Sequence, residues 1–123
     1  SAIKEPIEDA RFEIQDSLCK DEFIYYLVRF SWEIPNAGRM DYHLGIFRFD
    51  TNRKKSELLI DLGTGKGNTG DGELDSGFSM DIIGDTLFVY FSGTRADGEI
   101  TYGNELKYVV NLCNPENYIS IKQ

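Results

Sequence analysis

This chain repeats one order of short apolar runs, and that repetition limits the folds open to it more than any other property of the sequence. Helical periodicity is almost absent. Runs rich in Tyr, Phe, Val and Ile alternate with breaks rich in Gly, Asn and Asp, which indicates β-strands joined by turns. The predicted strands lie at residues 11–16, 22–32, 42–50, 57–61, 77–81, 86–92, 105–112 and 118–122. We therefore expect an all-β domain.

The eight runs divide into two similar sets of four. The segments that match are 12–14 and 78–80, 21–26 and 85–90, 42–49 and 106–112, and 58–60 and 118–120. A four-strand unit written twice predicts two repeated four-stranded antiparallel blades, that is, half of a β-propeller. Repeat one would span 11–61 and repeat two 77–122. An eight-stranded β-sandwich or barrel has the same strand count and is the alternative.

The length of 123 residues predicts a single domain, preceded by a polar, loosely held arm at 1–10. The chain begins with Ser1 and Ala2 and has no initial methionine, which we interpret as a cloning scar. A signal peptide removed upstream of it stays open as an alternative. No apolar run reaches the 18 or more residues typical of a membrane span.

The charge balance favours a basic partner. Twenty-one acidic residues oppose 13 basic ones, for a formal net charge of -8. Such a field repels nucleic acid and attracts positively charged proteins. The two cysteines, Cys19 and Cys113, match no metal-ligand spacing. We interpret them as reduced, partly buried thiols of a cytosolic protein, with a long-range disulfide in a secreted domain as the alternative.

The strand order predicts that the acidic residues gather at one edge. In an up-and-down blade, the connections after the second and fourth strands lie on the same edge, which assigns 33–41, 62–76 and 93–104 to it. Its acids are Glu33, Asp41, Asp71, Glu73, Asp75, Asp97 and Glu99, and its bases are Arg39, Lys66 and Arg95. The opposite edge carries the bases Lys20, Arg53, Lys54 and Lys55. The negative charge is therefore expected at the first edge.

The longest predicted irregular stretch, 62–77, contains a match to G-x-G-x-x-G at 65–70. A dinucleotide site needs this motif to open a helix, whereas here acids and another strand follow, so we reject that interpretation. Asp71, Glu73 and Asp75 alternate as calcium ligands do, but the rest of an EF-hand pattern is missing. We predict instead an acidic loop that orders on a partner.

Catalytic patterns are sparse. His43 is the single histidine, and we interpret it as a satisfied or surface residue rather than a general base. No G-x-S-x-G elbow occurs. The sequence therefore predicts a protein that is not an enzyme and that holds no cofactor or metal.

Aromatic residues are assigned by their position in the strands. Trp32 and Tyr102 lie at the acidic edge and are candidate binding anchors. The residues assigned to the core are Phe23, Tyr25, Phe47, Phe49, Phe88 and Phe91.

A small acidic domain with a doubled blade, an acidic edge and no catalytic pattern resembles the immunity proteins of bacterial contact-dependent growth inhibition systems. It is similar to the half-propeller type that neutralises an RNase A-like toxin. The resemblance covers 11–122. It implies a cytoplasmic bacterial antitoxin that blocks the active site of a cognate basic nuclease. These immunity proteins share no signature motif, so the expected site residues come from the charge argument alone.

We expect Asp71, Glu73 and Asp75 to bind the partner, helped by Asp97 and Glu99. The remaining candidates at this edge are Glu33, Asp41, Trp32 and Tyr102. Two other functions stay open. One is an extracytoplasmic β-domain that binds a glycan or another ligand, which a bond between Cys19 and Cys113 would favour. The other is a self-assembling blade module, since two blades leave an open apolar face. The sequence allows self-association but does not favour it.

Overall fold

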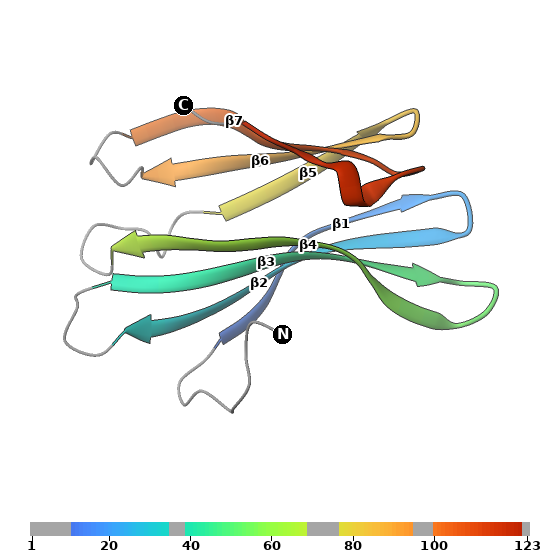
Figure 1. Ribbon diagram of the computed structural model, residues 1–123, viewed down its shortest axis with the longest axis horizontal. Coiled ribbons are helices and arrows are strands. Elements are labelled where there is room, and N and C mark those ends of the chain that lie inside the picture. Colours follow the sequence, from blue (N-terminus) through green and yellow to red (C-terminus); the bar gives the residue numbers. More distant parts are fainter. Residues whose placement is uncertain (1–10, 35–38, 69–76, 95–99, 122–123) are drawn as a thin grey trace.

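The computed structural model describes residues 11–34, 39–68, 77–94 and 100–121. Its strands are β1 (Arg11–Lys20), β2 (Phe23–Ile34), β3 (Arg39–Asp50), β4 (Lys55–Asn68), β5 (Gly77–Ile83), β6 (Thr86–Thr94), β7 (Ile100–Asn111) and β8 (Ile119–Ser120). A single 3-10 turn, η2 (Pro115–Asn117), precedes β8 in the described part. Figure 1 shows these strands as two layers, one above the other. The all-β prediction is confirmed.

The strands form two separate four-stranded sheets. The first sheet has the order β1-β2-β3-β4 and the second β5-β6-β7-β8. All neighbours pair antiparallel, so each sheet is an up-and-down meander. The predicted pair of four-stranded blades is therefore confirmed. The barrel alternative is wrong, because none of the described strands pairs across the two sheets to close them.

The strand β4 runs further than the sequence suggested. Residues 62–68, which we expected to be irregular, continue β4 and pair with β3 as far as Asn68 opposite Arg39. A register shift between Leu44 and Gly45 absorbs an extra residue at this point. Gly63 has φ 87, a conformation that glycine adopts without a steric penalty, and Asp61 Oδ1 accepts the Gly63 N–H at 2.8 Å. Three of the glycines that suggested a loop, Gly63, Gly65 and Gly67, therefore sit in a bulged strand.

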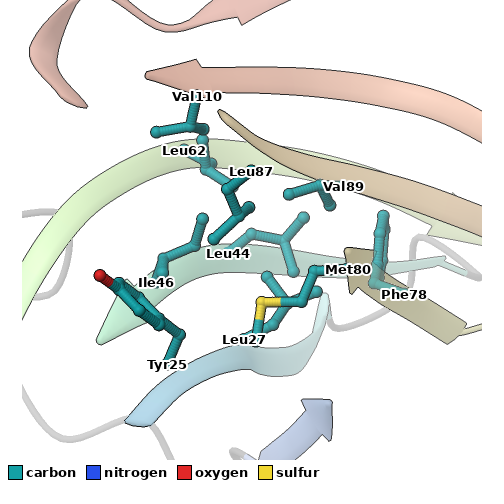
Figure 2. Packing of buried hydrophobic residues seen from close by; sticks show 10 residues of the cluster. All are labelled: Tyr25, Leu27, Leu44, Ile46, Leu62, Phe78, Met80, Leu87, Val89 and Val110. Carbon is teal, nitrogen blue, oxygen red and sulfur yellow. The ribbon is translucent and has the colours of Figure 1, made fainter. Parts of the chain in front are cut away.

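The core lies between the facing sides of the two sheets. Each sheet contributes five residues to this core, and Figure 2 shows their side chains meeting between the sheets. The residues are Tyr25, Leu27, Leu44, Ile46, Leu62, Phe78, Met80, Leu87, Val89 and Val110. Because side chains alternate along a strand, one face of each sheet supplies this core and the other face points away. We call these the inner and outer faces.

The two sheets are joined along their first strands. A register shift between Ile14 and Asp16 marks a bulge in β1. From this bulge, Gln15 Oε1 accepts the N–H of Phe78 at 3.1 Å, and Asp16 Oδ2 accepts the N–H of Met80 at 2.9 Å. Both donors lie in β5, the edge strand of the second sheet. Side chains of one edge strand thus satisfy the backbone of the other.

The outer faces are also apolar. On the first sheet the outer face carries Phe12, Ile14, Val28, Phe30, Phe47 and Phe49. On the second sheet it carries Ile83, Phe88, Tyr90, Val109 and Ile119.

The predicted core assignment is confirmed for Tyr25, and Phe23 and Phe91 pack against the core. It is wrong for Phe47, Phe49 and Phe88. In a β-sandwich the outward positions are polar, and these outer faces differ from that pattern in being apolar.

Tyrosines between the sheets predict a loss of stability in alkali. Burial raises the pKa of Tyr42 above its ordinary 10.0, Tyr108 raises it further, and Arg29 opposes the change. Above about pH 10 the unfolded chain loses this proton before the folded chain does, so the free energy of unfolding falls as pH rises. We expect the unfolding free energy of Tyr42→Phe to fall less between neutral and alkaline pH than that of the unaltered chain. Denaturant titrations at each pH measure both decreases. An equally steep fall in the variant would contradict the assignment.

Candidate partner-binding site

The ends of three strands lie together at one end of the molecule. Figure 1 shows that β2, β4 and β6 finish at the same end, where β3 and β7 begin. We call this the acidic end, because the connections that follow β4 and β6 hold five of the predicted acids, whereas 35–38 after β2 hold none. The strand directions confirm the predicted grouping of the three connections. Asp71, Glu73, Asp75, Asp97 and Glu99 lie in those connections, outside the described residues.

Three site residues predicted in connections fall in strands: Glu33, Asp41 and Tyr102. Trp32 lies in a strand, β2, as predicted. Glu33 belongs to β2, opposite Met40, and Tyr102 belongs to β7; their side chains lie outside the described part. Trp32 and Asp41 are direct cross-strand partners in β2 and β3, and both are partly buried. The strands are longer than predicted because backbone pairing continues past the last clearly apolar residue. The structure therefore brings Trp32 and Asp41 together on the outer face of the first sheet.

Trp32 belongs to a row of aromatic rings across β1 and β2. The Phe30 and Trp32 ring centroids are 6.0 Å apart, and the Phe12 and Phe30 centroids are 6.2 Å apart. Phe12 is 63% exposed. Such distances are typical of interacting aromatic pairs, which bury a large apolar area when a partner covers them. Phe12 and Phe30 were not predicted as site residues. Phe12 is two positions from Ile14, and Phe30 is two positions from Trp32, so the strand alternation could have placed each pair on one face.

Two ion pairs lie on the inner faces near the acidic end. Arg29 Nη2 is 3.6 Å from Glu13 Oε1, and Lys107 Nζ is 3.5 Å from Glu105 Oε1. The Glu105 side chain is only 8% exposed, and burying a carboxylate is costly unless it is paired. Tyr42, at the same end, contacts the Phe78 ring. The inner faces thus change from apolar to polar toward this end.

At the opposite end, two of the four predicted bases contact acids. Lys20 Nζ is 3.2 Å from Asp85 Oδ1, and Arg53 Nε is 3.9 Å from Asp50 Oδ2. Lys20 also donates to the Gly84 carbonyl in the β5–β6 turn. These contacts are exposed and contribute little stability, but they reduce the positive charge at that end.

His43 lies on the outer face of the first sheet. Its Nε2 is 2.5 Å from Asp61 Oδ1, which joins β3 to β4, and its partner in β2 is Phe30. The predicted surface or satisfied histidine therefore has an acidic neighbour.

Cys19 and Cys113 are exposed and not bonded to one another. The expectation that they are partly buried is wrong, because both lie at strand ends beside turns. Within the described ranges, no three His, Cys, Asp or Glu side chains gather as metal ligands. The same part of the chain holds no helix of the length and hydropathy that crossing a bilayer requires.

Comparison of the chain with protein-family models, with curated proteins and with solved structures finds no match.

Proposed function

We propose that this protein is an inhibitory binding protein whose acidic end blocks the active site of a basic nuclease toxin, as an immunity protein does. The observation that carries the proposal is that β2, β4 and β6 finish at one end of the molecule (Figure 1), where the connections after β4 and β6 hold five acids. A net charge of -8 supports it, since an acidic surface speeds the encounter with a basic partner. The proposed place of action is the bacterial cytoplasm.

The proposed mechanism is competition for phosphate-binding groups. A nuclease holds the scissile phosphate with Lys, Arg or protonated His. In the proposal, Asp71, Glu73 and Asp75 pair with these groups, and Asp97 and Glu99 extend the contact. Trp32 beside Asp41 supports a role as an aromatic anchor at the rim. RNA is then excluded from the occupied site. Neither an enzymatic step nor a cofactor is part of the proposal.

The first test is capture of the partner from a native lysate on the immobilised protein, followed by elution with increasing salt. We expect one small basic protein that is released at high salt and cleaves RNA once free. Capture of a partner without nuclease activity, or one indifferent to salt, would argue against the proposal.

The second test reverses charge at the acidic end. We expect Asp71→Lys with Glu73→Lys to raise the Kd for that nuclease about 100-fold, because close charge pairs contribute from about 1.5 kcal/mol each. The dependence of Kd on salt should also weaken. The matched control is Glu22→Lys with Glu116→Lys, two exposed acids at the opposite end. An equal loss in the control, or an unchanged salt dependence in the first variant, would refute the acidic-end assignment.

A further inference from the structure

The two hairpins at the starts of the sheets correspond residue by residue. In β1–β2 the pair Lys20 and Phe23 closes a two-residue turn, and in β5–β6 the pair Ile83 and Thr86 does the same. The first turn residue has φ 54 at Asp21 and φ 61 at Gly84, so both turns begin with a residue of positive φ. The predicted match of 21–26 with 85–90 is therefore wrong by one residue, because the hairpins align Phe23 with Thr86.

The alignment shows that the sheets pack head to tail. Outer-face residues of the first sheet correspond to inner-face residues of the second. The corresponding pairs are Ile24 and Leu87, Tyr26 and Val89, and Phe49 and Val110. In each pair the member from the second sheet is fully buried against the first sheet. In the other direction, Tyr25 and Leu27 of the core correspond to Phe88 and Tyr90 on the outer face of the second sheet.

The outer faces therefore continue the interface that already joins the two sheets. The outer face of the first sheet corresponds to the inner face of the second sheet, which is buried. The outer face of the second sheet corresponds in the same way to the buried inner face of the first. Among the described residues, the large hydrophobic side chains exposed by more than half all lie on these outer faces. They are Phe12, Ile14, Leu58, Ile83 and Ile119. Exposed apolar faces of this kind mark interaction surfaces.

We propose that the outer face of the first sheet in one copy of this chain docks on the outer face of the second sheet in another copy. The contact is heterologous, so it closes only as a ring. Propellers contain 4 to 8 blades, so rings of two to four copies satisfy every face. Rotation about the ring axis keeps the acidic ends on the same side. The proposal does not depend on the proposed function.

The first measurement is the mass in solution of the full chain, by light scattering and sedimentation at physiological salt, from low to high micromolar concentration. Salt matters because the copies are acidic and repel one another. We expect a mass two to four times 14.0 kDa. A mass of one chain over the whole range would overturn the proposal.

Substitutions then test the head-to-tail geometry. Ile14→Glu blocks the first outer face, and Ile119→Glu blocks the second; both sites are more than half exposed. We expect each variant to be monomeric, because every contact uses both faces. Mixing the two variants should restore a 1:1 dimer, since each pair then keeps one unaltered contact. Asn52→Glu adds the same charge on the exposed β3–β4 turn and should assemble as the unaltered chain does.

The contrary results are specific. If Ile119→Glu assembles normally while Ile14→Glu does not, the copies associate through like faces and the head-to-tail proposal is wrong. Assembly that survives both substitutions excludes the outer faces altogether. Circular dichroism establishes that each variant is folded. Leu58→Glu and Ile83→Glu, on the same two faces, serve if either first variant unfolds.

Discussion

Leu27→Ala is expected to lower the free energy of unfolding by about 3 kcal/mol, within the range for a buried leucine. Leu27 is 0% exposed, and its neighbours in β1 and β3 are Asp16 and Ile46. Figure 2 shows it beside Met80 of the second sheet. The alanine leaves a cavity at the contact between the sheets, where neither sheet closes the gap without moving as a whole. Small domains have only about 5–15 kcal/mol of stability in total, so the loss is large.

Denaturant unfolding measures this loss, with both proteins at the same low concentration. Leu58→Ala is the matched control, because it removes the same atoms from a side chain that is 53% exposed. We expect it to cost about 1 kcal/mol or less. Equal losses at the two positions would mean that the sheets do not pack through their inner faces as described.

Gln15→Ala with Asp16→Ala is expected to cost about 2–4 kcal/mol, because two backbone N–H groups of β5 lose their acceptors. The N–H groups of Phe78 and Met80 lie on the unpaired edge of the second sheet. Their acceptors come from a strand that makes no backbone pairing with β5. Removing both side chains weakens the contact between the sheets without altering the apolar core.

Amide hydrogen exchange locates this effect. We expect faster exchange at Phe78 and Met80 in the double variant, together with the loss in unfolding free energy. Asp81→Ala is the control, because Asp81 also accepts a backbone N–H at 2.9 Å, but from Ile82 in its own strand. It should leave the exchange of Phe78 and Met80 unchanged. A global loss of stability with no change at these two amides would contradict the bridging role.

The strand order predicted which strand ends lie together at the candidate site, but it did not predict which residues pair there. Counting strands between turns was enough to group the ends of β2, β4 and β6 at one end of the molecule (Figure 1). The pairing of Trp32 with Asp41 was not predictable, since it needs the register of β2 on β3. The continuation of β4 through Gly63 was missed for a similar reason. Local composition there favours a loop, whereas pairing with β3 decides the conformation.

The sequence by itself determined the strand count, the order of the strands and the turns that join them. These depend on local alternation and on turn residues such as Asp21 and Gly84, which act within a few positions. Only the tertiary structure decided which face of each strand is buried. Both faces of β2 are apolar, so a period of two identifies the strand but not its inner side. That choice depends on the second sheet, which covers Leu27 and leaves Phe30 on the outer face.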